Sequence, residues 1–217
     1  MCRKRSAVIV PGCSFSHETI IDGTCSKGVI HFCFVSDRRL VRSAIHCLKE
    51  FSIKLGHLTA IEWLRISVAL EECLLNAVIH GNLEVSSELR DSFDNSFDEL
   101  IVRRSGMSPY KDRRVTVIAR SSRDALRYRI RDEGKGLDVF SLPDPTAPEN
   151  LMKAYGRGVL LMRRYMDEVN YTKKGNEVIL VKRKEASAKR ISHRNLRRRV
   201  MFRFSFLNHQ SNGLRLM

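Results

Sequence analysis

The sequence predicts an α+β fold, a two-layer sandwich with helices packed on one face of a mixed, mostly antiparallel sheet. Along the 217 residues, apolar segments follow strand or helix spacing in the order βαα(α)ββαββ. Consecutive strands are joined by short turns, which favours pairing between neighbours. Hydrophobic residues make up 43% of the chain, so one packed core is expected rather than disorder.

The first strand and the first helix are expected between residues 29 and 55. Residues 29–35, Val-Ile-His-Phe-Cys-Phe-Val, are predicted to form a strand. Asp37 is a plausible N-cap for a helix that continues to about Leu55, and Gly56 can end that helix. The apolar residues of this helix recur at helical spacing: Leu40, Val41, Ala44, Ile45, Leu48 and Phe51.

A second, longer helix is predicted from Thr59 to about Gly81. Glu62 follows Thr59 by three residues, so the two side chains can form a capping box with the free backbone N–H groups at the helix start. Residues 83–112 are polar, and one or two short helices are expected there.

Two further strands and a long loop follow. Residues 114–119 and 125–130 have strand patterns, and residues 121–124 form the turn between them. Residues 137–155 hold three of the five prolines and are predicted to be a loop. Because long loops without structure are uncommon in compact domains unless they are functional, this one is expected to act as a lid.

The last elements are a short helix at residues 158–166 and a hairpin. The hairpin pairs residues 168–172 with residues 177–181 around the turn Lys-Lys-Gly-Asn. The globular domain is therefore predicted to cover residues 27–184, preceded by an irregular, flexible leader at residues 1–26 that is rich in Gly, Ser and Thr.

The positive charge is concentrated after the predicted domain. The formal net charge is +15, and residues 185–217 hold eight Lys/Arg and one acidic residue. This tail is predicted to be disordered. Such basic arms can contact nucleic acid or anionic lipid, but a solvated tail without a dedicated role is at least as common.

The cysteines do not indicate a metal site. The six of them, at positions 2, 13, 25, 33, 47 and 73, include no Cys-x-x-Cys pair, so zinc is not expected. Cys33, Cys47 and Cys73 lie in apolar stretches, as small core residues of a reducing cytosol do. No apolar run approaches the 18 or so residues of a membrane span, so no membrane partner is expected and the cytoplasm is the expected location.

The second helix contains polar residues where a buried helix should be apolar. Ten of the 14 residues from Ile66 to Ile79 are apolar, so most of the helix surface must be covered. Glu72, Asn76 and His80 nevertheless lie at i, i+4 and i+8, on one side of the helix. They form either an internal hydrogen-bond ladder or the polar wall of a ligand site.

Two glycine motifs favour the ligand site. Asp132, Gly134 and Gly136 follow directly on a predicted strand, where glycines let the backbone approach a flat ligand and the carboxylate offers an acceptor; alone, this pattern also fits a tight turn. Gly156 and Gly158 come immediately before a helix, whose free N–H groups suit phosphates, although a loop hinge would look the same. The first motif is not a dinucleotide-binding fingerprint, because no third glycine and helix follow it.

In this order, the three motifs resemble the ATP-binding boxes of the gyrase, chaperone, histidine-kinase and mismatch-repair ATPase superfamily. Within that superfamily, the chain is most similar to the anti-sigma factor serine kinases of bacteria. The resemblance covers roughly residues 27–184. Its carrying segments are Ala69-Leu-Glu-Glu-Cys-Leu-Leu-Asn-Ala-Val-Ile-His-Gly-Asn82, Arg131-Asp-Glu-Gly-Lys-Gly-Leu-Asp138 and Gly156-Arg-Gly-Val-Leu-Leu-Met-Arg-Arg-Tyr-Met-Asp-Glu-Val169.

The resemblance implies a Bergerat fold that binds ATP with Mg²⁺. Asn76 looks like the magnesium ligand, and Glu72 is similar to the general base beside the γ-phosphate. Arg157 resembles a residue that neutralises charge on the transferred phosphoryl group. Asp132 looks like the acceptor for the adenine amino group. The other expected nucleotide contacts are His80, Gly134, Lys135, Gly136, Leu137, Gly156, Gly158 and Val159, with residues 137–157 as the ATP lid.

The chain also departs from the family pattern. Residues 83–112 form an insertion where compact members have a short connection. Gly175-Asn176 replaces the usual Gly-Thr, which puts one minor hydrogen bond to the nucleotide in doubt.

The resemblance implies a protein serine kinase that regulates transcription by partner switching. Its expected partners are an anti-anti-sigma (STAS-type) protein as phosphate acceptor, a sigma factor that it sequesters, and a second copy of itself in a homodimer. The alternative is a nucleotide-gated module that grips a partner without phosphorylating it. The catalytic part of a two-component histidine kinase is disfavoured, because only about 60 residues precede the Asn76 helix and leave no room for a dimerising histidine helix.

Overall fold

The computed structural model describes residues 22–26, 28–54, 58–91, 94–136 and 157–184. The chain forms two compact units, Met1–Arg183 and Lys184–Met217. All helices and strands described below belong to the first unit. Of the second unit only Lys184 is described, so the predictions for the basic tail lie outside the described residues.

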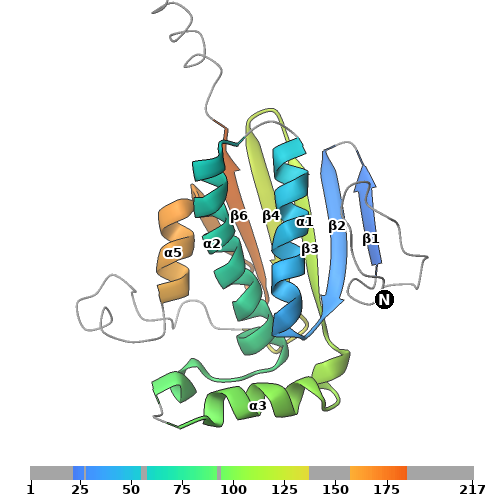
Figure 1. Cartoon of the computed structure of the whole chain (residues 1–217), viewed down its shortest axis with the longest axis vertical. Helices are drawn as coiled ribbons and strands as arrows, with labels where there is room; N and C mark the ends of the chain where they lie inside the picture. Colours follow the sequence, from blue (N-terminus) through green and yellow to red (C-terminus); the bar gives the residue numbers. More distant parts are fainter. Residues whose placement is uncertain (1–21, 27, 55–57, 92–93, 137–156, 185–217) are drawn as a thin grey trace, which may run out of the picture. The chain divides into compact units, whose positions relative to one another are not determined.

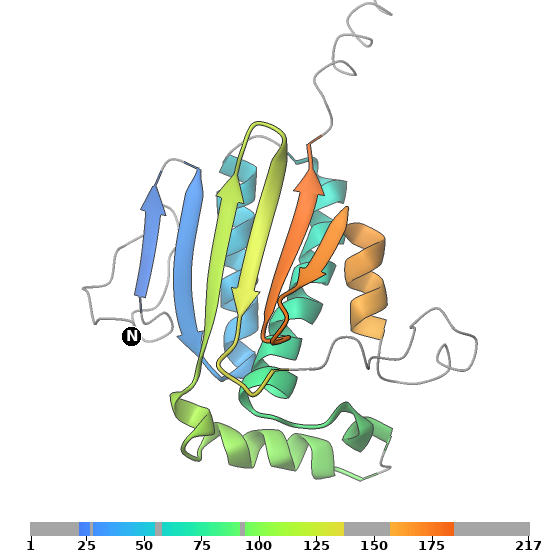
Figure 2. The same ribbon diagram turned by 180° about the vertical axis from the view of Figure 1, so that it is seen from behind.

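A sheet of six strands in the order β1-β2-β3-β4-β6-β5 forms one layer (Figures 1 and 2). Each pairing among the described strands is antiparallel, as predicted for most of the sheet. The strands are β1 (Asp22–Ser26), β2 (Val29–Val35), β3 (Arg114–Ser121), β4 (Ala125–Arg131), β5 (Glu168–Tyr171) and β6 (Glu177–Arg183).

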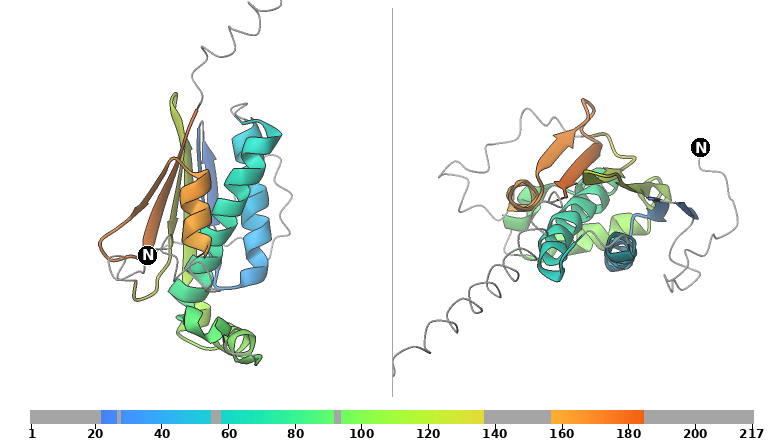
Figure 3. Two further views of the ribbon diagram at one scale, coloured as in Figure 1. Left: turned by 90° about the vertical axis from the view of Figure 1, so that its left-hand side faces the viewer. Right: turned by 90° about the horizontal axis from the view of Figure 1, so that it is seen from above.

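The helices form the second layer. Helices α1 (Val41–Lys54), α2 (Ala60–Asn76) and α5 (Arg157–Tyr165) lie on one face of the sheet, with α2 between the other two (Figures 1 and 3). Helix α3 (Ser96–Ser105) lies across the end of the sandwich at which α2 ends (Figures 1 and 2). This arrangement confirms the predicted α+β sandwich.

Alternating side chains of the sheet supply half of the core. In β4, Leu126, Tyr128 and Ile130 are buried, whereas the arginines between them are exposed. The one polar atom of this row is satisfied, because the Tyr128 hydroxyl lies 2.9 Å from the Ser52 hydroxyl of α1. The helix layer closes over these side chains with Leu48, Ile66, Leu70, Leu74 and Met162. Cys33, Cys47 and Cys73 are buried, as expected for small core residues.

The helix starts agree with the predicted caps. Asp37 accepts a hydrogen bond from the backbone of Arg39 and begins a 3₁₀ turn, Arg38–Leu40, that leads into α1. Thr59 and Glu62 form both bonds of the capping box at the start of α2. Gly56, the predicted end of the first helix, lies outside the described residues.

The leader prediction is wrong for its last five residues. Asp22–Ser26 forms β1, which pairs with β2 from Asp22 opposite Cys33 to Ser26 opposite Val29. Its sequence, Asp-Gly-Thr-Cys-Ser, has no apolar alternation that could have revealed it. The strand forms because β2 offers an edge of unpaired backbone groups, and backbone pairing depends little on side-chain type.

The second helix continues past Asn76 in a different form. Residues Ala77–Asn82 make a π-helical turn, η2, so the predicted end near Gly81 is confirmed but the last turn is wider than an α-turn. Such turns are rare and are frequent at functional sites. The segment 83–112 then contains α3 and two 3₁₀ turns, η3 (Ser87–Asp91) and η4 (Tyr110–Asp112), in agreement with the short helices expected there. Within the part of the chain that the structure describes, no helix combines the length and apolarity that a bilayer span requires.

Candidate active site

Glu72 and Asn76 on α2 face the first turn of α5. A β-carbon added at Gly158 would lie 2.6 Å from Glu72 Oε2 and 3.6 Å from Asn76 Nδ2, so a side chain there would displace the Glu72 carboxylate while leaving Asn76 in ordinary contact. Both side chains are partly exposed, although Leu70, Cys73 and Leu74, in the same part of the helix, are fully buried. The structure therefore brings together two of the predicted motifs that are more than 80 residues apart in the sequence.

The carboxyl group of Glu72 is partly buried. Burial raises the pKa of Glu72, and the nearby carboxylate of Glu71 raises it further, while the positive charge of Arg90 opposes both effects. A glutamate with a raised pKa takes up a proton more readily near neutral pH than an exposed one. This is the property that a general base needs.

His80 closes the end of the helix. Its Nδ1 lies 2.6 Å from the carbonyl oxygen of Val85, and burial lowers the pKa of the imidazole. The sequence left two roles open for His80, a phosphate contact or closure of the helix end. The contact with Val85 is the one that the structure shows.

Asp132 lies at the other end of the site, where β4 ends. Its residue is only 7% exposed, and its Oδ1 accepts a hydrogen bond of 2.8 Å from the backbone of Gly134. Burial raises the pKa of Asp132 to about 6, because the loss of hydration outweighs that hydrogen bond. A buried carboxylate with a free oxygen is a strong acceptor for a donor on a bound ligand.

Two glycines allow the loop of Asp132 to lie against the π-helical turn η2. A β-carbon on Gly81 would lie 2.7 Å from each carboxylate oxygen of Asp132. A β-carbon on Gly134 would lie 2.6 Å from the carbonyl carbon of Gly81. Gly136 has a φ of +86°, and a β-carbon there would collide with the carbonyl group of Lys174. Side chains at Gly81 and Gly134 would force the loop away from η2, and a side chain at Gly136 would force it away from the turn between β5 and β6.

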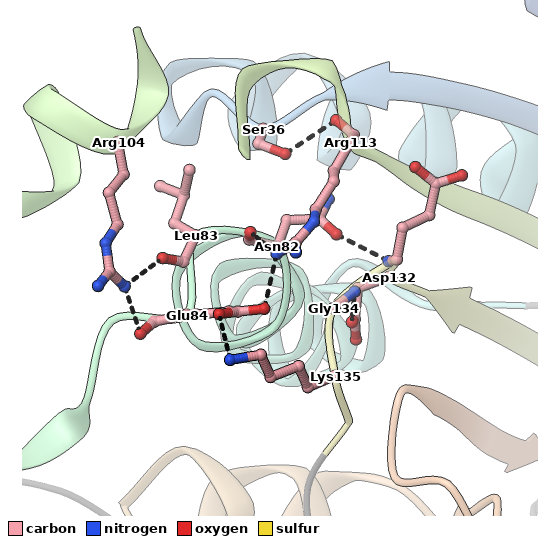
Figure 4. Close-up of polar contacts among 10 residues, drawn as sticks. Ser36, Asn82, Leu83, Glu84, Arg104, Arg113, Asp132, Gly134 and Lys135 are labelled. Carbon is pink, nitrogen blue, oxygen red and sulfur yellow. Dashed lines mark hydrogen bonds and ion pairs between the residues drawn. The ribbon is translucent and has the colours of Figure 1, made fainter. Parts of the chain in front are cut away.

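A polar network joins the Asp132 loop to the segment that follows the helix (Figure 4). Asn82 is fully buried; its Oδ1 accepts from the backbone N–H of Glu133 at 2.7 Å, and its Nδ2 has no partner among the described residues. Glu84, with a left-handed φ of 53°, forms ion pairs with Arg113 at 2.9 Å and with Lys135 at 3.3 Å. Burial and its partners act in opposite directions on Glu84, and its pKa is lowered.

Asn176 supports Asp132 from the turn between β5 and β6. The backbone N–H of Asp132 donates to the carbonyl oxygen of Asn176, and the side-chain Nδ2 of Asn176 donates to the carbonyl oxygen of Asp132, both at 3.0 Å. Sequence reasoning regarded Asn176 only as a departure from the usual Gly-Thr. The structure shows that it fixes the backbone of Asp132 on both sides.

Of the remaining residues predicted to contact the nucleotide, some are exposed, one packs against the core, and others lie outside the described residues. Lys135 is 83% exposed and is directed to Glu84 by their ion pair. Arg157 is exposed at the first position of α5, and Val159 packs against the core. Leu137, Gly156 and the lid before Arg157 lie outside the described residues.

Several residues at the site were not predicted from the sequence. Gly81, Asn82, Glu84 and Arg113 support the Asp132 loop, and Arg90 acts electrostatically on Glu72. Gly81 and Asn82 were included in the segment Ala69–Asn82 that carries the resemblance, so the His-Gly-Asn pattern was an available signal. Nothing local marks Glu84, Arg90 or Arg113, because their roles depend on the folding of residues 83–112.

The family comparison agrees with this geometry. A family model described as histidine kinase-like ATPase domain matches residues 34–182, which is more than half of the chain and includes all three motifs. The chain belongs to this family. No curated protein matches the chain. As a member of the histidine kinase-like ATPase family, the protein has an ATP-binding domain, and the family typically uses Mg²⁺ with the nucleotide.

The residues present fit ATP and Mg²⁺. Asp132 provides the buried acceptor, and the glycines of its loop let the backbone pack closely against Gly81 and Lys174, which fixes the position of that acceptor. Asn76 offers an amide oxygen, a hard ligand that suits Mg²⁺, and this ion usually takes its other ligands from phosphates and water. Within the described residues no group of three His, Cys, Asp or Glu side chains is gathered for a metal.

Proposed function

We propose that this histidine kinase-like ATPase is a protein serine kinase that phosphorylates an anti-anti-sigma (STAS-type) protein and regulates transcription by partner switching. The observation that carries the proposal is the position of Glu72, one helical turn from Asn76 and against Gly158 at the start of α5. Glu72 and Asn76 thus both face the first turn of α5, and the N–H groups in the first turn of a helix lack partners within the helix itself.

Each of these residues supports one part of phosphoryl transfer. Glu72, with its raised pKa, would accept the proton of the incoming serine hydroxyl. Asn76 would hold Mg²⁺, which supplies charge neutralisation at the phosphates. Exposed Arg157 at the first turn of α5 would offset negative charge on the transferred group. Most of the catalytic effect in such transfers comes from positioning and electrostatics rather than from covalent chemistry.

The test compares two neighbouring glutamates. Glu72→Gln should retain ATP binding but lose transfer of labelled phosphate to a serine of the partner protein, by roughly a hundredfold or more, as is typical for loss of a general base. Glu71→Gln is the matched control, because Glu71 is exposed on the same helix turn. Transfer that is undiminished in Glu72→Gln would refute the role of Glu72.

The alternative function is nucleotide-gated binding of a partner without phosphorylation. It is favoured by the way residues 83–112 are tied to the site, since Arg104 donates to the carbonyl oxygens of Leu83 and Glu84 and Arg113 donates to that of Asn82. Binding or loss of the nucleotide would therefore be transmitted to residues 83–112 through these hydrogen bonds. A partner that is retained by the protein only with ATP, and that never acquires phosphate, would support this alternative.

A further inference from the structure

The segment 83–112 does more than cover one end of the sandwich. After the π-helical turn, the chain is held by two arginines: Arg104 Nη1 lies 2.7 Å from the carbonyl oxygen of Leu83, and Arg113 Nη1 lies 2.7 Å from that of Asn82 (Figure 4). Both guanidinium groups also stack on Tyr110, at 4.9 and 5.1 Å from the ring centroid. The start of the segment is therefore fixed relative to α2.

The same segment places an arginine on the side of the molecule where α5 begins (Figures 1 and 2). Val85, which is 1% exposed and bonded to His80, anchors the chain before the 3₁₀ turn η3. Arg90 lies on η3, exposed, with its guanidinium carbon 4.9 Å from the centre of the Phe97 ring on α3. In Figures 1 and 2, η3 lies on the same side of the molecule as the first turn of α5, below the end of α2.

The electrostatics of the site agree with this placement of η3. The positive charge of Arg90 partly offsets the rise that burial causes in the pKa of Glu72, and it adds to the lowering that burial causes in the pKa of His80. Asp132, at the other end of the site, responds instead to Lys174 and Arg113. Arg90 thus acts at the end formed by Glu72, Asn76 and Gly158.

We propose that Arg90 binds the terminal phosphate of ATP, so that residues 83–112 supply a cation to the site and make it distinguish ATP from ADP. The proposal rests on the ATP-binding site described above, and it does not require that the protein be a serine kinase. An arginine suits this task because its planar guanidinium group can donate two hydrogen bonds to one phosphate. Stacking on Phe97 holds the side chain in place before the nucleotide arrives, which reduces the entropy lost on binding.

The experiment measures the dissociation constants of ATP and ADP with Mg²⁺ by calorimetry, without any partner protein. Arg90→Ala should weaken ATP binding by roughly tenfold or more, the usual effect of losing a charge-assisted hydrogen bond, and should change ADP binding by less than about twofold. Arg90→Lys, which keeps the charge without the planar fork, should give an intermediate loss for ATP. Arg103→Ala is the matched control, because Arg103 is an exposed arginine of α3 in the same segment.

A second variant checks that position matters and not only charge. Phe97→Leu removes the ring under Arg90 and should weaken the binding of ATP more than that of ADP. The thermal unfolding midpoint of each variant shows whether it is folded. Equal loss of ATP and ADP affinity in Arg90→Ala, no loss of ATP affinity, or the same loss in Arg103→Ala would overturn the proposal. A protein that binds ATP in this selective way but transfers no phosphate would overturn the kinase function and leave the role of Arg90 supported.

Discussion

Replacing Asp132 by asparagine should stabilise the folded protein near neutral pH while it destroys ATP binding. The side chain keeps its size, so it still fits against Gly81, and an amide oxygen can still accept the hydrogen bond from Gly134. What disappears is a carboxylate that is 7% exposed and whose pKa burial raises from 3.8 to about 6. Holding that charge out of water lowers the stability of the folded protein. We expect the buried carboxylate to be kept nevertheless, because a bound ligand needs it as a hydrogen-bond acceptor.

The pH dependence gives the magnitude and the sign. Because the folded protein binds the Asp132 proton more tightly than the unfolded chain, this group contributes stability that is fully present below about pH 4 and is lost as the pH rises through about 6. A shift of about two pH units corresponds to about 3 kcal/mol. Asn has no proton to lose, so the gain of Asp132→Asn over wild type should rise from about 1 kcal/mol at pH 4.5 to about 3 kcal/mol at pH 8.

Urea unfolding of both proteins across this pH range measures the difference. Asp124→Asn is the matched control, since Asp124 is exposed in the turn between β3 and β4, and its difference from wild type should stay within about 0.5 kcal/mol at every pH. Calorimetry with ATP and Mg²⁺ should register no binding to Asp132→Asn. A free-energy difference between wild type and Asp132→Asn that is flat from pH 4.5 to pH 8 would refute the assignment of a raised pKa to this carboxyl.

Two further predictions concern the support of the Asp132 loop. Gly134→Ala should destabilise the protein by about 1–3 kcal/mol and abolish ATP binding, because its β-carbon would overlap the backbone of Gly81 in η2; thermal unfolding and calorimetry measure both effects. Gly106→Ala is its control, with a nearest contact of 3.6 Å and an expected change within about 0.5 kcal/mol. Arg113→Leu should cost about 2 kcal/mol in urea unfolding and weaken ATP binding, because it leaves the partly buried Glu84 without its closest ion-pair partner. Exposed Lys111→Leu, in the same segment, should change neither quantity, and equal effects of the two variants would contradict the proposed support.

Local chemistry made much of the fold predictable. The capping box at Thr59 and Glu62 needs only residues three apart, and it forms as expected. The alternation in residues 114–119 and 125–130 likewise identified β3 and β4, because strand neighbours point to opposite faces of a sheet. Where such a pattern is lacking, as in Asp22–Ser26, the prediction failed: this strand is stabilised by the backbone of β2.

The sequence predicted only part of the candidate site. Glu72 and Asn76 could be singled out because polar side chains in an apolar helix require an explanation. The residues that determine the surroundings of Glu72 and Asn76 come from distant parts of the chain. Gly158 lies against them, and the charge of Arg90 acts on Glu72. No spacing in the sequence encodes those distances.

The sequence by itself determined which elements form and which chemical groups the site contains, because hydrophobic period, caps and motif residues act over a few neighbouring positions. The tertiary structure alone decided how those groups are charged and placed: Asp132 acquires its high pKa from burial against Gly81, and Arg90 acquires its position from the packing of residues 83–112. Desolvation and Coulomb interaction depend on distances through space, and these are fixed only when the sheet and helix layers have closed around the core.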